Sequence, residues 1–302
     1  MSIDATANQS REKDKLWQGS NYQGLFDPEN NLGIVTDVCL KRKIRNYVET
    51  VKDGKEGFRI YIKDDAPLNR KDLEAVSYIG IDAKTPDDLK KALAAANKAK
   101  PEEKELREKA DKMILDFMCK NYYDIRTFGA VMTTFVKAAL NCGQVLGPVQ
   151  LGFARSVEPV IPQEVTITRV AITTEEDAEK KGTEMGRKYI VHYGLYRCEG
   201  YISANLARKT TGFSEEDLSL LWEAMLNMFE HDRSAARGNM AVRDLIIFKH
   251  DSEYGNYPAH KLFETVKVSR KDSTYVPRCF DDYKVEVDEK AIPSGVSLIR
   301  MG

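Results

Sequence analysis

Positive charge is concentrated near the start of one predicted helix, where four of five consecutive residues are cationic. Thr36 is a residue type that caps helix N-termini, and it stands just before this cluster. At 100° per residue, Lys41, Arg42 and Arg45 fan across about 100° of one flank, while Lys43 lies on the other. Ammonium and guanidinium groups in such an arc can donate hydrogen bonds to phosphate oxygens. The alternative is an ordinary solvated flank.

A second candidate anion contact follows a later predicted helix. His231, Arg233, Ser234 and Arg237 precede Gly238, and this mixture can donate several hydrogen bonds to phosphate oxygens. The overall charge is nearly balanced, so any attraction to a polyanion must come from local groups such as these.

Two other interpretations of this loop stay open. Arg233 and Arg237 could pair with local carboxylates such as Asp232 and Asp244. His231 beside Asp232 could suggest acid-base chemistry, but sequence neighbours at a helix end point in different directions, so adjacency is a weak indication.

Common catalytic signatures do not occur in the sequence: Walker A, GxGxxG after a strand, HExxH and GxSxG are all missing. Asp37, Asp124 and Asp232 carry oxygen ligands that suit a divalent cation for RNA cleavage. Their spacing gives no support for such a site. We therefore predict no catalytic residue, no metal and no cofactor, and a protein that is not an enzyme.

Composition limits the class of protein further. The 302 residues predict one main domain with insertions, and 46 basic against 47 acidic residues exclude a whole-molecule attraction to nucleic acid or membrane. The five cysteines are odd in number and form no CxxC pair, which argues against a disulfide framework or a zinc site. No apolar run approaches the roughly 18 residues of a membrane helix, so we expect a soluble, cytoplasmic protein without a membrane partner.

Apolar residues at helical spacing predict two strong helices and a third helical region. The first follows Thr36, and its buried stripe is Leu40, Ile44, Tyr47, Val48 and Val51. The second starts at a capping box formed by Ser214 to Asp217, and its stripe is Leu218, Leu221, Trp222, Met225, Leu226 and Phe229. The third covers residues 86–120, starts at Thr85 and is broken near Pro101.

Alternating or β-branched residues predict the strands. They lie at 58–62, 165–172, around 189–193 and at 245–248, with further sheet elements in the Gly-punctuated runs 128–132 and 143–153. The strands near 165–172 and 189–193 enclose a polar tip, which indicates a hairpin. Residues 1–31 show no run long enough for a strand, and we expect an irregular arm there.

Several of these segments together resemble the backbone subunit of type I-C CRISPR Cascade complexes, in the Cas7 branch of the repeat-associated RNA-binding superfamily. The resemblance extends from about Gly33 to Ser269. Its landmarks, long and in a fixed order, are Val35–Tyr47, Ile125–Met132, Gly143–Gln150, Phe153–Pro159, His192–Tyr196 and Met228–Gly238.

The resemblance implies an α+β fold with a ferredoxin-like (RRM-like) palm, a helical fingers insertion and a β-hairpin thumb. The corresponding boundaries are residues 1–32 for an irregular N-terminal arm, 33–53 and 125–302 for the palm, 54–124 for the fingers and about 160–190 for the thumb.

The function implied is that of a non-catalytic subunit that binds CRISPR guide RNA, oligomerises along it with other Cascade subunits, and presents it for pairing with target DNA. Phosphate contacts from the basic helix would position a guide without reading its sequence. Thumb residues such as Ile167 and Val170 would wedge between bases held by the neighbouring copy. The expected RNA-contacting residues are Lys41, Arg42, Arg45, Phe128, Gln144, Gln150, Arg155, Ile167, Arg169, Val170, His231, Arg233, Ser234 and Arg237.

Two departures from the family pattern are visible. Family members begin with an apolar strand and an Asn-Pro-Asn-Gly-Asp-Pro loop before the turn that is Asp27-Pro28-Glu29 here, and neither is recognisable, which predicts a gap inside the sheet. A few extra residues at 135–141 lengthen a loop. Two rival interpretations remain: a metal-dependent endoribonuclease of the same superfamily, and a degraded member that neither assembles nor binds.

Overall fold

The computed structural model describes residues 2–4, 26–64, 67–80, 85, 87, 88, 91, 101–133, 135, 141–169, 184–233 and 239–302. The chain forms two compact units. Unit 1 comprises Met1–Lys43, Leu151–Glu199 and Met225–Gly302, and unit 2 comprises Ile44–Gln150 and Gly200–Ala224. The mixture of helices and strands in these units confirms the predicted α+β class.

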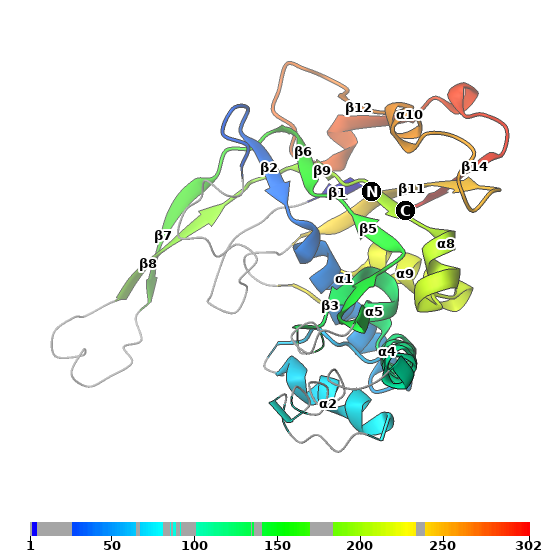
Figure 1. The fold of residues 1–302 in the computed structure, drawn as a ribbon. Coiled ribbons are helices and arrows are strands. Elements are labelled where there is room, and N and C mark those ends of the chain that lie inside the picture. Colours follow the sequence, from blue (N-terminus) through cyan, green and yellow to red (C-terminus); the bar gives the residue numbers. More distant parts are fainter. Residues whose placement is uncertain are drawn as a thin grey trace, which may run out of the picture. The chain divides into compact units, whose positions relative to one another are not determined.

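Unit 1 is built on a six-stranded antiparallel sheet (Figure 1). In spatial order the strands are β14 (Val296–Met301), β11 (Ala241–His250), β1 (Ser2–Asp4), β9 (Leu195–Arg197), β6 (Ala154–Pro159) and β2 (Leu32–Val35). Along the chain, α1 (Asp37–Lys52) follows β2, and α9 (Glu215–Asn227) precedes β11. Strand β11 confirms the strand predicted at 245–248.

The interior position in this sheet is filled by the first strand of the chain. Ser2 pairs with Arg197 on one side and with Asp244 on the other, so β1 lies between β9 and β11. The predicted gap and the fully irregular arm are therefore wrong for residues 2–4. Three residues are too few to show an alternating pattern, and their partners lie far along the chain, which is why the sequence did not indicate them.

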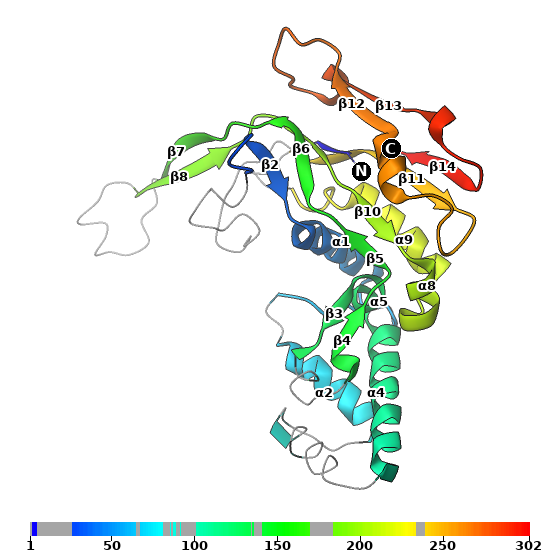
Figure 2. The ribbon, with the colours of Figure 1, turned by 45° about the horizontal axis from the view of Figure 1, so that its top comes forward.

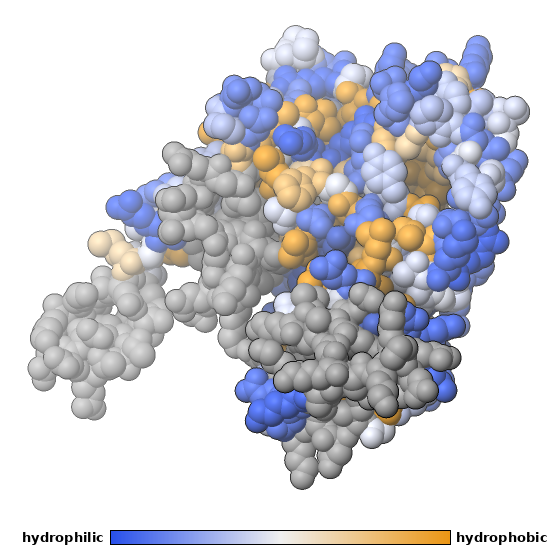
Figure 3. Space-filling model, viewed as in Figure 1, coloured by the Kyte–Doolittle hydropathy of each residue, from blue (hydrophilic) through white to orange (hydrophobic). Residues whose placement is uncertain are grey.

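A hairpin is present, as predicted, and consists of β7 (Gln163–Arg169) and β8 (Glu184–Ile190), paired from Gln163 with Ile190 to Arg169 with Glu184. Its second strand lies earlier in the chain than the predicted 189–193 and ends at Ile190. Figure 3 shows hydrophobic beside hydrophilic side chains on it. Val165, Ile167 and Met185 are exposed to solvent there. The hairpin therefore presents apolar side chains to solvent.

A second hairpin and a short helix complete unit 1. Strands β12 (Val266–Arg270) and β13 (Tyr283–Val287) lie side by side (Figure 2), and α10 (Ala259–Glu264) precedes β12. Tyr193, Leu195 and Tyr283 form a buried cluster with partly buried neighbours from β6 and β12. The short single-turn elements are η4 (Phe280–Asp282) and η5 (Glu289–Ala291).

Unit 2 is mostly helical and contains the predicted fingers, residues 54–124, together with segments on both sides of them. Figure 2 shows α2 beside α4, and the two helices pack around a core that includes Val76, Ile114 and Met118. Strand β5 pairs with β10. The elements are α2 (Leu68–Tyr78), α4 (Pro101–Asn121), α5 (Tyr123–Phe128), β3 (Gly129–Val131), η2 (Asn141–Gly143), β4 (Gln144–Leu146), β5 (Val149–Leu151), β10 (Gly200–Ile202), α8 (Ala204–Leu206) and η3 (Ala207–Thr211).

Three predicted helix starts are confirmed by their capping hydrogen bonds. The Thr36 hydroxyl accepts a bond from Cys39 N at 3.3 Å. Ser214 and Asp217 cap α9 reciprocally, with N–H to side-chain distances of 3.2 and 2.9 Å. Thr85 and Asp88 do the same at 3.1 Å. The predicted stripe of α1 is buried except at Val51, which is 40% exposed.

The strand predicted at 58–62 is wrong. Arg59 makes an isolated bridge with Tyr122, and the backbone N–H groups of Tyr61 and Ile62 donate instead to the Asp124 carboxylate, at 2.7 and 3.0 Å. A buried side chain from a distant segment thus takes over the hydrogen bonds that a neighbouring strand would have made.

The Gly-punctuated runs form β3, β4 and β5, as predicted. Gly129 has φ +74°, and a Cβ added to it would lie 2.1 Å from the Val145 carbonyl oxygen. A Cβ on Gly147 would lie 2.2 Å from Gly129 N. Glycine is required here because the two backbones approach closely.

Candidate nucleic-acid interface

The entry into α1 fixes where its basic residues start. Gly33 in β2 donates its N–H to the Ser156 hydroxyl at 2.8 Å, and a Cβ on Gly33 would lie 2.4 Å from the Tyr196 hydroxyl. Burial raises the pKa of Tyr196 to about 12, so this phenol stays neutral. The close contact holds β2 against the sheet three residues before the Thr36 cap.

Lys41 and Arg42 are the partly accessible members of the basic cluster in α1. Lys41 Nζ lies 2.9 Å from Asp37 Oδ2, one helical turn earlier. Arg42 is also partly buried. The two side chains are 15% and 23% exposed. An ammonium has three donors, so a phosphate can share Lys41 with Asp37.

Lys43 brings the two predicted anion contacts together. Its Nζ lies 2.5 Å from Asp232 Oδ2, and Lys43 is only 4% exposed. Asp232 lies just beyond the turn that ends α9, where its N–H donates to the Phe229 carbonyl at 3.1 Å. The first turns of α1 and residues 231–233 therefore lie side by side in unit 1.

His231 and Arg233, which flank Asp232, are both exposed. Arg233 pairs with a local carboxylate, as the alternative interpretation proposed, and the partner is Glu230 instead of Asp232 or Asp244. Asp244 instead accepts two bonds from Arg300, at 3.0 and 2.7 Å. Ser234 and Arg237 lie outside the described residues.

The structure gives Arg45 a different role from the one expected. Its Nε donates to Asp124 Oδ2 at 2.8 Å, its guanidinium carbon lies 5.4 Å from the centre of the Phe128 ring, and it is only 6% exposed. Arg45 and Phe128 therefore contribute to the interior of unit 2. The usable signal was Asp124 itself: an aspartate between Tyr123 and Ile125, both core residue types, needs a cationic or hydrogen-bonding partner.

The remaining expected contacts are distributed over both units. In unit 2, Gln144 is exposed on β4, and the Gln150 amide donates to the Gly147 carbonyl at 3.0 Å. In unit 1, Arg155 is exposed on β6 with a guanidinium nitrogen 3.6 Å from an Asp27 oxygen, and Ile167 is 43% exposed on β7. Strand β7 ends at Arg169, whose side chain the structure does not describe, and Val170 lies outside the described residues.

The three aspartates considered for a metal each have a cationic partner. Asp37 pairs with Lys41, Asp124 with Arg45, and Asp232 with Lys43. Within the described parts of the chain, no group of three or more His, Cys, Asp or Glu side chains is arranged to hold a metal ion.

Unit 1 thus combines an antiparallel sheet with the first turns of α1, on which Lys41 and Arg42 are partly accessible. Residues 21–288 match the family described as CRISPR-associated protein Cas7, and the chain belongs to this family. None of the helices that the structure describes is both long enough and apolar enough to cross a membrane.

Relatives are found by sequence and by structure. A "CRISPR-associated protein Cas7" from Haloferax volcanii is 25% identical over 283 residues, which cover 87% of this chain and 73% of that protein. A chain of a "CRISPR RNA-guided surveillance complex, pre-nicking" has a TM-score of 0.46 and 16% identity, covering 85% of this chain and 79% of its own. A chain of a "CRISPR RNA-guided surveillance complex" has a TM-score of 0.33 and 13% identity. The match covers 86% of the present chain and 82% of the other.

Proposed function

We propose that this protein is a non-catalytic backbone subunit of a type I-C Cascade surveillance complex. Several copies line up along the CRISPR guide RNA in the cytoplasm, together with other subunits, and present the RNA for pairing with target DNA. The observation that carries the proposal is the match to the Cas7 family over residues 21–288. The sequence landmarks support the type I-C assignment.

The geometry supports a phosphate-contacting surface on unit 1. Lys41 and Arg42 on α1 and His231 and Arg233 after α9 are partly or fully exposed, and the Lys43–Asp232 contact joins the two segments. Contacts to phosphates carry no sequence information, which suits a guide whose sequence must vary. Arg155 and Ile167 extend the proposed contact set within unit 1, and Gln144 and Gln150 are proposed as separate contacts on unit 2. Arg45 and Phe128 lie in the interior of unit 2.

A ferredoxin-like palm fits the order of elements around the six-stranded sheet, with α1 and α9 each divided between the two units. If β2 and the elements inserted between the others are set aside, the chain runs β1, α1, β6, β9, α9, β11, and the four strands adjoin in the order β11, β1, β9, β6. In this proposal unit 2 includes the fingers, and the β7–β8 hairpin is the thumb. Its exposed Val165 and Ile167 are suited to insert between bases held by a second copy.

The proposal is tested by purifying the protein after co-expression with a CRISPR array and its companion subunits, then sequencing the nucleic acid that copurifies. We expect discrete repeat-spacer RNA in a high-mass complex. A folded protein without RNA would overturn the proposal. RNA cleavage that requires Mg²⁺ and is lost on replacing one aspartate would favour the endoribonuclease instead.

Replacing both Lys41 and Arg42 with glutamate is expected to weaken guide-RNA binding roughly 10- to 100-fold. The slope of log K against log salt concentration should become about 1.4 less steep, because two phosphate contacts are lost. Filter binding at several salt concentrations measures both effects. The matched control is Lys249→Glu with Lys267→Glu, which makes the same charge change at exposed positions of β11 and β12. Equal loss in both double variants would contradict the assignment of α1.

A further inference from the structure

We infer that Lys43 and Asp232 form a positioning pair, which holds the residues after α9 against α1 so that Arg233 and the basic start of α1 contact the same stretch of RNA. This inference rests on the proposed function and adds to it a residue that acts on RNA without touching it. The supporting contact is the 2.5 Å distance between Lys43 Nζ and Asp232 Oδ2.

Burial distinguishes Lys43 from Lys41, Arg42 and Arg233, which are partly or fully exposed. Its side chain is 5% exposed and that of Asp232 is 15% exposed, whereas Arg233 is 67% exposed. A phosphate cannot reach an ammonium that is enclosed in this way, and lysine is rarely buried without a partner. Lys43 is therefore placed to orient a neighbouring segment, not to bind RNA directly.

The segment that Lys43 holds is anchored from one side by the core. Met228 and Phe229 are buried, and local backbone bonds form the turn: Glu230 N donates to Asn227 O at 3.0 Å, and Asp232 N to Phe229 O at 3.1 Å. These bonds are internal to the turn and do not fix it to α1. The Lys43 contact does, because it joins Asp232 to a helix from a distant part of the chain.

Arg233 is the residue through which the pair would act. Its ion pair with Glu230 is exposed on both sides, and exposed pairs are worth little, so the guanidinium can exchange Glu230 for a phosphate oxygen. Arg233 is the next residue after Asp232. The ion pair between Asp232 and Lys43 therefore keeps Arg233 close to α1. Loss of the pair would uncouple Arg233 from the phosphates that Lys41 and Arg42 bind.

The test is a double-mutant cycle between Lys43→Met and Arg233→Ala, with a single-stranded guide RNA transcribed from the array as the probe. Each single change is expected to weaken binding roughly tenfold, and the double variant only slightly more than either, because both remove the same contact. Arg233→Ala and Lys43→Met should also flatten the salt dependence to a similar extent. Lys41→Ala serves as the control. When it is combined with Lys43→Met, the fold-losses in RNA affinity of the two single variants should multiply.

The outcomes separate the inference from the proposed function. A wild-type protein that does not bind the RNA would overturn both. Two results would overturn the positioning pair alone, provided that the wild type binds the RNA. In the first, the fold-losses in RNA affinity from Lys43→Met and Arg233→Ala multiply in the double variant. In the second, the Arg233→Ala variant binds the RNA as tightly as the wild type. If Lys43→Met does not fold, the exchanged pair Lys43→Asp with Asp232→Lys replaces it. In the exchanged pair we expect Arg233 still to contribute to RNA affinity. The inference would be contradicted if the exchange variant folds but adding Arg233→Ala to it leaves the RNA affinity unchanged.

Discussion

Replacing Asp124 with alanine is expected to lower the free energy of unfolding by about 3–5 kcal/mol, the cost typical of removing one partner of a buried ion pair. Asp124 is fully buried and accepts three hydrogen bonds, from Arg45 Nε at 2.8 Å and from the N–H groups of Tyr61 and Ile62. The alanine variant would leave a guanidinium and two backbone donors without this acceptor inside unit 2.

Urea unfolding followed by circular dichroism measures this effect. Asp124→Asn, which keeps an oxygen acceptor but loses the charge, should fall between the wild type and the alanine variant. Asp116→Ala is the matched control, because Asp116 is exposed on α4 and such surface changes stay within about 0.5 kcal/mol. Similar midpoints for Asp124→Ala and Asp116→Ala would show that the buried carboxylate does not stabilise the unit.

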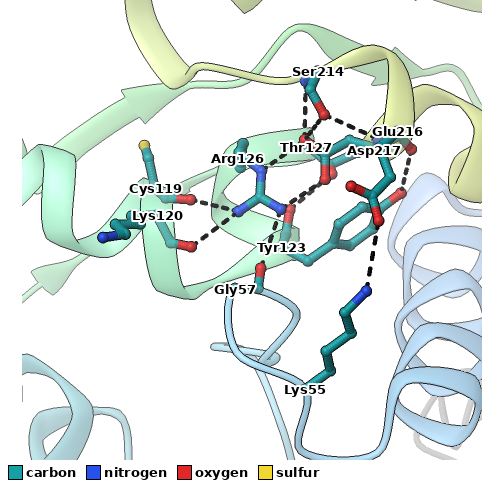
Figure 4. A network of polar contacts seen from close by, with 10 residues as sticks. All are labelled: Lys55, Gly57, Cys119, Lys120, Tyr123, Arg126, Thr127, Ser214, Glu216 and Asp217. Carbon is teal, nitrogen blue, oxygen red and sulfur yellow. Dashed lines mark hydrogen bonds and ion pairs between the residues drawn. The ribbon is translucent and has the colours of Figure 1, made fainter.

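Replacing Arg126 with methionine is expected to be comparably destabilising, about 3–5 kcal/mol, because it leaves the Asp217 carboxylate buried without its cation. Figure 4 shows the guanidinium between α9, the end of α4 and the loop at Gly57. It donates to both Asp217 oxygens, at 2.8 and 2.7 Å, to the Cys119 carbonyl at 2.6 Å and to the Gly57 carbonyl at 3.1 Å. Arg126→Lys should recover little, since an ammonium cannot span these acceptors. A lysine variant as stable as the wild type would contradict this account.

The same pair gives the stability of the chain an acid dependence. Burial alone would raise the pKa of Asp217, but the hydrogen bonds from Arg126 and Ser214 outweigh it and hold the pKa below its ordinary value. A depressed pKa in the folded state stabilises the chain above the unfolded-state pKa, near pH 4, and this stabilisation is lost as the pH falls through the folded-state value.

We therefore expect the thermal midpoint to fall as the pH is lowered below about 4, and to fall less steeply in Asp217→Asn, which has no carboxylate to protonate. The control is Glu216→Gln, which removes the carboxylate next to Asp217 in the sequence. The Glu216 side chain is 67% exposed and its carboxylate lies 3.7 Å from Lys55 Nζ, so its removal should change the acid dependence little. The account would be wrong if Asp217→Asn and the wild type lost stability in parallel.

Elements with local signals were predictable from the sequence, and contacts between distant segments were not. The caps at Thr36 and Ser214 and the stripe that contains Leu40 and Ile44 depend on residues a few positions apart. The strand predicted at 58–62 failed because its amide partner is a carboxylate from α5.

The basic cluster shows the same limit within the site. Helical spacing placed Lys41, Arg42 and Arg45 on one flank, but it could not reveal that Asp124 would draw Arg45 into the core or that Asp232 would enclose Lys43. Which cation of a cluster remains accessible depends on where distant carboxylates lie. The sequence therefore predicted the position of the cluster but not which of its members are buried in ion pairs.

The interior position of β1 has a consequence for the order of folding. Ile3 pairs with Tyr196 and Val242, so β1 can be paired only after the much later strands β9 and β11 have been synthesised. Pairings between such distant segments close slowly, and strands β9 and β11 expose unpaired edges until they form. The sheet of unit 1 is thus complete only when β1 has entered between β9 and β11, and the edges of these two strands must be protected from other chains until that step occurs.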